Sequence, residues 1–295
     1  MTIEFRPLPP FDYVSPGSLA EAVNLLTEHG ASAKLLAGGT DLLPRMKKRK
    51  SSPRVVIDLN RIVDLSFIAV RENALHIGAG TRLAMLYDSR VIRDKAAALA
   101  DAIHVMSSPS IRNRATIGGN LCNASRCADT PAPLLVLDAC VKLLGPDGER
   151  NVPISSFFIA PGNGSGKTVL RSDEVMTEVI IPLQAGNSTF LKLGRRRGSS
   201  TSIISAAAFV AMANGKFKDV RIAVSAFGLT PIRSEKVEVA LVGAPVDEKT
   251  IEQAAAWIKD EINPITDFRA SAAYRTDMAA VLIERAVTRL AIGGS

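Results

Sequence analysis

Cysteine, aromatic residues and long uncharged segments are all scarce in this chain of 295 residues. The three cysteines are an odd number, which in a chain of this length does not form a disulfide framework. The longest uncharged run, Gly198 to Gly215, has an apolar part of about Ile203 to Ala213, too short to span a bilayer. The start of the chain lacks a basic segment followed by an apolar stretch. We therefore expect no signal peptide, no transmembrane segment and a place in the reducing cytoplasm.

The overall composition is that of a folded globular protein. Hydrophobic residues make up 47% and charged residues 22%, which excludes wholesale disorder. At roughly 100–200 residues per domain, the length suggests two domains. The net charge of +7 permits a nucleic acid, an anionic ligand or an acidic partner. The basic runs Arg45–Lys50 and Arg195–Arg197 contain no aromatic residue, so we expect a solvated face or a subunit contact and no nucleic-acid binding.

The first sixty residues have the pattern of an α/β layer. Ser18 and Glu21 form a capping box that begins a helix with an apolar stripe. A short strand at 34–37 leads into two glycines, a second helix begins at Leu42, and 55–59 has the pattern of a buried strand. A strand, loop, helix and strand within about 30 residues is typical of an α/β layer.

The rest of the chain predicts a hairpin, a helical region and a second, smaller domain. We expect a hairpin over 67–78, helices over 83–105, a polar loop over 107–114 and a strand over 134–144. The segment 116–121 follows the loop, and we expect its glycine pair to lie in a polar loop as well. The composition changes near 160–167, where we place the domain boundary. Beyond it we expect an antiparallel sheet of strands at 178–182, 190–193, 205–212 and 220–227, with helices at 233–241, 249–260 and 270–290.

Two glycine pairs are the strongest local signals for a ligand site. Gly38-Gly39 precedes Thr40 and Asp41, and Gly118-Gly119 precedes Asn120. Glycine allows positive φ and a close approach to the backbone, and successive N–H groups in such turns can hold a pyrophosphate. Each pair is also compatible with a simple tight turn, and the sequence leaves both interpretations open.

Other motifs exclude several chemistries. The stretch 162–168 resembles a P-loop, but the required first glycine is replaced by Pro161, so we interpret it as a linker. No histidine has a second ligand at metal spacing, and three cysteines without a nearby histidine do not close a tetrahedral zinc site. We expect buried, unreactive cysteines. The sequence therefore favours a site built from backbone, without a catalytic triad or a metal.

Several motifs in order along the chain resemble one known family, the FAD-binding medium subunit of the molybdenum hydroxylases, which includes xanthine dehydrogenase and aerobic carbon monoxide dehydrogenase. The strongest motif runs from Ser108-Pro109 to Leu121. The other matching stretches are Phe11-Asp12-Tyr13, Ser18–Ala22, Leu36–Pro44, His76–Thr81, Asp173–Val175, Ile181-Pro182, Phe190–Lys192, Pro231–Arg233 and Leu241–Gly243.

The resemblance implies an α+β fold with two domains. It implies a FAD-binding domain of the vanillyl-alcohol-oxidase type over 1–167, with subdomains of about 1–60 and 61–167. A small C-terminal α+β domain of antiparallel sheet and helices would occupy 168–295.

The resemblance also implies a cofactor site and no catalytic residue on this chain. The loop 37–42 would hold the FAD pyrophosphate, 116–120 would lie against the flavin and ribityl side, and 110–114 would line the flavin pocket. Asp129 matches an acidic flavin-side ligand, and Lys192 matches a residue beside the adenine end. The cofactor-binding residues implied are Leu36, Ala37, Gly38, Gly39, Thr40, Asp41, Leu42, Met106, Ser110, Thr116, Ile117, Gly118, Gly119, Asn120, Cys122, Asp129, Thr177 and Lys192.

Two departures from related proteins refine the cofactor prediction. Covalent flavoproteins carry a histidine near the first glycine pair, where this chain has Thr40, so we expect non-covalent FAD. Hydroxybenzoyl-CoA reductases resemble the chain around Cys122 and Cys127 but carry an inserted loop with further cysteines and a four-iron cluster. Here Ala128 and Asp129 follow directly, and three cysteines cannot supply four thiolates, so we expect no cluster and no metal in this chain.

The implied function is that of an electron-transfer subunit. A large partner would hold the molybdenum cofactor, a small partner would carry two two-iron clusters, and the three would form a dimer of heterotrimers. FAD in this chain would pass electrons to an external acceptor. The alternatives are a stand-alone flavin oxidoreductase with its own substrate pocket and a non-catalytic nucleotide-binding module. The sequence identifies neither the hydroxylated substrate nor the acceptor.

Overall fold

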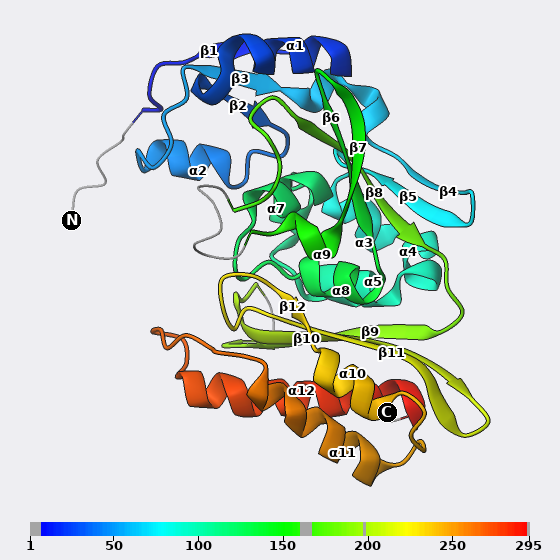
Figure 1. The fold of residues 1–295 in the computed structure, drawn as a ribbon. Coiled ribbons are helices and arrows are strands. Elements are labelled where there is room, and N and C mark those ends of the chain that lie inside the picture. Colours follow the sequence, from blue (N-terminus) through cyan, green and yellow to red (C-terminus); the bar gives the residue numbers. More distant parts are fainter. Residues whose placement is uncertain (1–6, 160–166, 197–198, 294–295) are drawn as a thin grey trace.

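Three β-sheets organise the part of the chain that the computed structural model describes, residues 7–159, 167–196 and 199–293 (Figure 1). In Figure 1 the N-terminal sheet lies at the top, a larger sheet with several helices lies in the middle, and a third sheet with its own helices lies at the bottom. Gly162–Gly166 of the P-loop-like stretch and Arg197 of the second basic run lie outside the described residues.

The N-terminal sheet is parallel and confirms the predicted α/β layer. Its strands are β1 (Asp12–Val14), β2 (Ala33–Leu36) and β3 (Val55–Asp58), in the order β1-β3-β2, with helices α1 (Leu19–His29) and α2 (Leu42–Lys47). Ser18 caps α1, since its hydroxyl accepts from the Glu21 N–H at 3.2 Å. Because β2 and β3 run in the same direction, their carboxyl ends meet at one edge, where the first glycine pair follows β2.

The second sheet is antiparallel and has five strands in the order β4-β5-β8-β6-β7. The strands are β4 (Ile68–Arg71), β5 (Ala74–Gly78), β6 (Cys140–Gly145), β7 (Gly148–Pro153) and β8 (Val175–Pro182). The accompanying helices are α3 (Leu83–Asp88), α4 (Arg90–Lys95), α5 (Ala97–Val105), α6 (Pro109–Arg112), α7 (Ile117–Asn123), α8 (Pro131–Val136) and α9 (Ile154–Phe157). Alternate residues of β5, β6 and β8 share one buried core with these helices.

Three predictions about this region were wrong. The strand predicted at 178–182 for the C-terminal sheet is β8, which lies between β5 and β6. The strand predicted over 134–144 is the end of α8 followed by β6, with Asp138 at positive φ between them. The second glycine pair, predicted in a loop, lies in the first turn of α7. Since β8 pairs with earlier strands, we propose a domain boundary at 183–186 in place of 167.

The third sheet has the order β12-β11-β10-β9 and forms the C-terminal part of the molecule. Its strands are β9 (Asn187–Gly194), β10 (Ser202–Ala213), β11 (Lys216–Ser225) and β12 (Ile232–Arg233), and its helices are α10 (Glu235–Leu241), α11 (Glu248–Ala256) and α12 (Ala272–Ala291). Short 3-10 turns lie at Gly30–Ser32, Leu59–Arg61, Val63–Leu65 and Trp257–Asp260.

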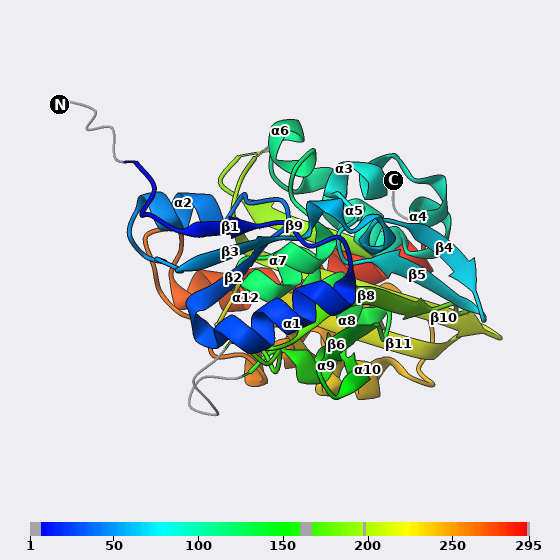
Figure 2. The ribbon, with the colours of Figure 1, turned by 90° about the horizontal axis from the view of Figure 1, so that it is seen from above.

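The uncharged run of the sequence is explained by β10. Helices α5 and α8 pack on one face of this sheet and α12 on the other, as Figures 1 and 2 show. Along β10, Ala207 and Phe209 belong to the core shared with the first domain, whereas Ile204, Ala206 and Ala208 belong to the core shared with α12. Among the described residues, no helix combines the length and the hydrophobicity needed to cross a membrane.

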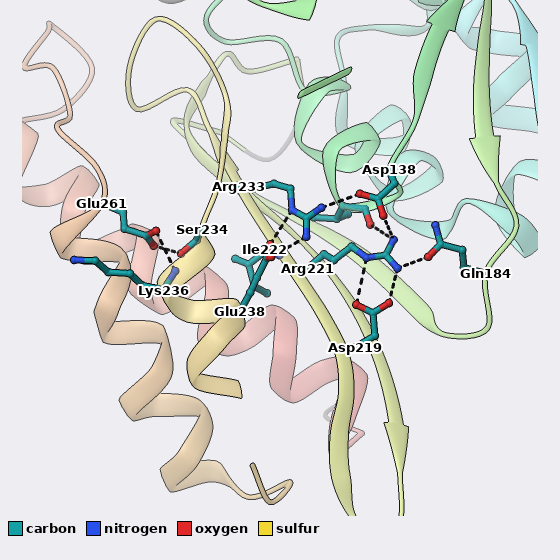
Figure 3. A network of polar contacts seen from close by, with 11 residues as sticks. Asp138, Gln184, Asp219, Arg221, Ile222, Arg233, Ser234, Lys236, Glu238 and Glu261 are labelled. Carbon is teal, nitrogen blue, oxygen red and sulfur yellow. Dashed lines mark hydrogen bonds and ion pairs between the residues drawn. The ribbon is translucent and has the colours of Figure 1, made fainter. Parts of the chain in front are cut away.

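A polar network joins the two domains (Figure 3). Asp138 lies in the turn between α8 and β6. Its carboxylate forms an ion pair with Arg221 of β11 at 2.7 Å and another with Arg233 of β12 at 2.8 Å. Glu238 of α10 holds Arg233 at 2.7 Å and accepts from the Ile222 N–H at 2.9 Å. Because these contacts connect the α8 turn with two strands of the third sheet, they fix the C-terminal sheet against the first domain.

Candidate FAD site

The loop after β2 offers unused backbone donors. Gly39 has φ +72°, a conformation that L side chains rarely adopt. Among the described residues, no acceptor takes the N–H groups of Gly38, Gly39, Thr40 or Asp41, although the Gly39 carbonyl accepts from Leu43 at 3.1 Å. Gly38, Gly39 and Thr40 are half-buried and Asp41 is exposed, and successive N–H groups without protein partners are suited to an anionic ligand.

In the second glycine segment, by contrast, the backbone N–H groups are already hydrogen-bonded within the protein. Thr116 caps α7, and the first N–H groups of the helix all have acceptors inside the protein. Ile117 donates to the Thr81 carbonyl at 3.1 Å, Gly118 to the Ala79 carbonyl at 2.9 Å, and Gly119 to the Thr116 hydroxyl at 3.1 Å. A Cβ at Gly118 would lie 2.7 Å from the Ala79 Cβ. This glycine therefore allows α7 to pack closely, and its N–H is not available to a ligand.

The structure brings the two segments together. A Cβ at Gly38 would lie 2.1 Å from the Arg114 carbonyl oxygen and 2.8 Å from the Ala115 Cα. The first loop thus lies directly against the residues that lead into α7. Asn60 fixes the loop from the end of β3, since its Nδ2 donates to the Ala37 carbonyl at 2.9 Å.

A buried ion pair follows α7. Lys192 Nζ of β9 donates to Asp129 Oδ2 at 2.6 Å, and both side chains are almost fully buried. Ser202 of β10 also donates to Asp129. Burial raises the pKa of the Asp129 carboxyl, and the Lys192 charge and the hydrogen bonds from Lys192 and Ser202 oppose that rise. Next to this pair, Thr130 Oγ1 donates to Asn120 Oδ1 at 2.6 Å, which connects it to α7.

Comparison with family models decides the assignment. Residues 9–184 match the model described as the FAD binding domain in molybdopterin dehydrogenase, and residues 189–290 match the CO dehydrogenase flavoprotein C-terminal domain. The chain belongs to the FAD-binding medium-subunit family of the molybdenum hydroxylases. The gap between the two matches, residues 185–188, overlaps the boundary of 183–186 that we propose from the sheets.

Individual relatives agree along nearly their whole length. The chain is 32% identical over 286 residues to a putative xanthine dehydrogenase FAD-binding subunit of Escherichia coli, covering 94% of this chain and 96% of that one. It is 34% identical over 281 residues to the carbon monoxide dehydrogenase medium chain of Hydrogenophaga pseudoflava, covering 95% and 96%.

Solved structures confirm the predicted fold class of a FAD-binding domain followed by a C-terminal domain of antiparallel sheet. A carbon monoxide dehydrogenase structure from Hydrogenophaga pseudoflava matches with a TM-score of 0.92 at 34% identity, covering 98% of this chain and all of that one. Quinoline 2-oxidoreductase from Pseudomonas putida matches with a TM-score of 0.90 at 27% identity, covering 97% and 99%.

The remaining predicted site residues of this medium-subunit chain lie around the two segments in different ways. Leu36 ends β2 and Leu42 begins α2, so both flank the first loop. Thr177 of β8 accepts the Ala79 N–H at 2.9 Å through its carbonyl and therefore supports the backbone that holds Gly118. These three residues shape the backbone of the candidate site.

Of three further predicted residues, Met106 lies near the Lys192 and Asp129 pair, Cys122 lies in α7, and Ser110 lies in α6. Met106 is buried directly after Val105, whose carbonyl accepts from Lys192 Nζ at 3.4 Å. Ser110 is exposed in α6. Cys122 lies in α7, where burial raises the pKa of its thiol to about 12, so the thiol stays protonated and poorly reactive.

One pair of predictions conflicts with the observed geometry. The resemblance assigns Asp129 to the flavin side and Lys192 to the adenine end, yet the two side chains contact each other at 2.6 Å. A contacting pair does not lie at both ends of an extended dinucleotide. Because Thr130, next to Asp129, donates to Asn120, we propose that both residues lie on the same side of the cofactor as Asn120.

Sequence reasoning missed the residues that support these groups. Asn60 follows the carboxyl end of β3, the edge where a parallel sheet places loop residues, so its position carried a usable signal. Ser202 carried none, because its partner Asp129 lies 73 residues away in the sequence.

Proposed function

We propose that this chain carries FAD as the electron-transfer subunit of a molybdenum hydroxylase complex. The observation that carries the proposal is the loop of Gly38 to Asp41, whose N–H groups have no acceptor within the described residues. Such a loop fits a pyrophosphate, because oriented N–H groups stabilise negative charge without adding a second charged group. Family membership over 9–184 supports the same ligand.

The chain's residues would hold and orient the cofactor, which supplies the redox chemistry when bound. The first loop would bind the pyrophosphate, and Asn120, Asp129 and Lys192 would form the polar wall on the flavin side. The packed start of α7 keeps that wall in a fixed position against the loop. With Thr40 where covalent flavoproteins have a histidine, we propose that FAD is held without a covalent bond.

Partner chains would supply the remaining redox centres. Relatives carry names such as medium chain and FAD-binding subunit, which describe parts of larger assemblies. We propose a large molybdenum-cofactor subunit that oxidises the substrate and a small subunit with two two-iron clusters, assembled as a dimer of heterotrimers. Electrons would pass from the clusters through FAD to an external acceptor. The free cysteines of this chain are compatible with a complex in the reducing cytoplasm.

The loop assignment is tested by Gly39→Val. A β-branched residue at φ +72° costs about 1–2 kcal/mol of backbone strain and distorts the donor geometry, so we expect FAD to bind at least about tenfold more weakly. The matched control is Gly215→Val, which has the same φ of +72° but lies in the β10–β11 turn with no atom within 4 Å. Flavin absorbance of the purified proteins measures occupancy. Equal FAD binding in the two variants contradicts the loop assignment.

Purification of the native complex from the source cells tests the wider proposal. FAD together with iron, molybdenum and two further subunits is the expected result. Turnover of a small molecule by this chain with FAD alone supports a stand-alone oxidoreductase and contradicts the electron-transfer role.

A further inference from the structure

A cavity of about 340 Å³ lies between the first domain and the C-terminal sheet, at the start of α5 and the start of β9. Cavities of roughly 300–1,000 Å³ are the usual size for small-molecule ligands. Its walls come from α4 and α5 of the first domain, from the residues that begin β9, and from the last turn of α12. Every residue that lines it lies within the described ranges, and both domains contribute to it.

The cavity is separate from the residues assigned to FAD, none of which lines it. Helix α5 and strand β9 reach the candidate FAD site only at their other ends, where Lys192 Nζ donates to the Val105 carbonyl at 3.4 Å. Since a helix rises 1.5 Å per residue, the start of α5 at Ala97 and its end at Val105 are about 12 Å apart. Along β9, Ser188 and Lys192 are about 13 Å apart. The cavity is therefore distinct from the candidate FAD site.

Hydrogen bonds between the two domains fix one wall of the cavity. The hydroxyl of the buried Thr189 donates to Asp101 Oδ2 at 2.7 Å, and the Phe190 N–H donates to the same oxygen at 3.3 Å. The Ser188 hydroxyl accepts from the Ala98 N–H at 3.1 Å, so its own hydrogen is available to a ligand. This wall is thus held in place before any ligand binds.

Three cations and two carboxylates line the cavity, and both carboxylates already have protein partners. Asp94 forms an ion pair at 3.5 Å with Arg90, which lies outside the lining. Asp101 accepts the two hydrogen bonds from β9 and lies 3.9 Å from Arg289. Because the negative charge is engaged in this way, positive charge predominates toward a ligand.

The cations keep free donors. Lys95 has no ion-pair partner among the described residues, and the one ion pair of Arg289 there is the long contact to Asp101. Arg93 is oriented through Nη1, which donates to the carbonyls of Tyr87 and Asp88 at 3.2 and 3.3 Å. Its remaining nitrogens are therefore directed by a fixed guanidinium. Cations with free N–H groups suit an oxyanion, and charge-assisted bonds to phosphate are among the stronger contacts in proteins.

The uncharged part of the lining indicates which kind of oxyanion fits. None of the described residues that line the cavity is aromatic, so they offer no stacking surface to a nucleobase. Asn187 and Ser188 instead present an amide and a hydroxyl, which pair with ligand hydroxyl groups. A small ligand with one phosphate and several hydroxyl groups matches both parts of the lining.

We propose that this cavity binds a sugar phosphate between the two domains. The phosphate contacts Lys95 and Arg289, and the sugar hydroxyls contact Asn187 and Ser188. The proposal goes beyond the proposed function, on which it rests only in treating the first glycine loop as the FAD site.

The test is a calorimetric titration of the FAD-saturated chain with ribose 5-phosphate, since bound FAD keeps phosphate out of the first glycine loop. We expect binding at least about tenfold weaker in Lys95→Gln/Arg289→Gln, because two charge-assisted contacts are lost. The matched control, Lys47→Gln/Lys48→Gln, removes the same charge from exposed positions at the end of α2, on the opposite side of the molecule in Figure 1. It should bind ribose 5-phosphate within about threefold of the unaltered chain.

A second variant tests the sugar. Asn187 is exposed at the first position of β9, so Asn187→Ala should fold normally. We expect it to bind ribose 5-phosphate at least about threefold more weakly and inorganic phosphate as well as the unaltered chain does, because only the hydroxyl contact is lost.

Three outcomes overturn the proposal. The FAD-saturated chain binds no ribose 5-phosphate, or the double variant and its control bind it equally, which excludes Lys95 and Arg289. In the third, inorganic phosphate binds as tightly as ribose 5-phosphate, which shows an adventitious ion only. Flavin absorbance of the same samples reports FAD occupancy. A chain that takes up no FAD contradicts the proposed function alone, since the comparison of the two double variants still reports on the cavity.

Discussion

The two glycine pairs have the same appearance in the sequence and opposite uses in the structure. At Gly38-Gly39 the backbone turns through positive φ, and four successive N–H groups lack acceptors among the described residues. At Gly118-Gly119 the backbone is helical, and the corresponding N–H groups already donate to Ala79 and Thr116. Both pairs allow close packing, at Gly38 against Arg114 and at Gly118 against Ala79, but only the first pair presents free donors among the described residues.

We therefore propose that the second segment contributes to the site through side chains. Asn120 projects from α7 to Thr130, and the neighbouring Asp129 pairs with Lys192 of the third sheet. These groups connect the FAD-binding region with the C-terminal domain. If the two glycine pairs differ in this way, changes to the backbone at the first pair should impair FAD binding. Changes to packing or side chains around the second pair should instead lower the free energy of unfolding.

The largest effect is expected for Lys192→Met. Removing one member of a buried ion pair leaves an uncompensated charge, which costs about 3–5 kcal/mol in the free energy of unfolding. Burial holds the folded-state pKa of Asp129 above its unfolded value, and losing the Lys192 charge raises it further. The folded state then binds a proton more tightly than the unfolded state, so stability is lost as pH rises through the folded pKa and is recovered as pH falls.

Urea denaturation between about pH 8 and pH 5 measures this dependence. The control Asp129→Asn/Lys192→Met carries no charge at this pair. It should be more stable than Lys192→Met near pH 8, and its free energy of unfolding should depend less on pH. A Lys192→Met variant whose stability does not improve on acidification contradicts the role given to the pair.

An intermediate effect is expected for Gly118→Ala. The new Cβ would lie 2.7 Å from the Ala79 Cβ and 2.8 Å from its carbonyl oxygen, so α7 or the Ala79 segment has to move. Overpacking of this kind costs about 1–3 kcal/mol in the free energy of unfolding. The control Gly228→Ala meets no atom within 4 Å and should change stability by less than about 0.5 kcal/mol.

The same variant separates packing from ligand binding. Folded Gly118→Ala should bind FAD more tightly than Gly39→Val does, as measured by titration with FAD. If Gly118→Ala loses FAD as completely while remaining folded, the start of α7 contacts the ligand directly and the distinction between the two pairs fails.

Local patterns predicted most elements but not how they combine. The N-cap at Ser18, the layer of β2, α2 and β3, and the C-terminal helices all depend on short-range signals, which the structure reproduces. The predicted capping box is only half formed, because Glu21 accepts from the Gly17 N–H and not from the Ser18 N–H. The pairing of β8 depends on strands about 40 and 100 residues earlier, and no local pattern specifies a partner at that range. Helix α7 escaped prediction because its first turn contains two glycines, which are poor helix formers.

In the candidate site, too, the sequence did not show which distant residues come into contact. The residue types and the glycine turns pointed to a backbone-built cofactor site, but which N–H groups already had acceptors depended on Ala79 and Thr81, distant in the sequence. The contact between Asp129 and Lys192 joins residues 63 apart and became visible only when β9 was placed beside the end of α5.

The smallest effect is expected for Thr116→Val, which replaces the N-cap hydroxyl of α7 by a methyl group of similar size. The hydroxyl accepts from the Gly119 N–H at 3.1 Å, and loss of such a cap costs about 1 kcal/mol in the free energy of unfolding. Thr116→Ser keeps the acceptor and should retain most of that stability, and urea denaturation of both variants measures the difference. If the Gly119 N–H serves the helix, Thr116→Val should keep its FAD affinity within about threefold, since less than 1 kcal/mol is then at stake in binding. A variant that keeps its stability but binds FAD more than tenfold better or worse shows that the Gly119 N–H is shared with the ligand, and the second pair would then have to be counted with the first.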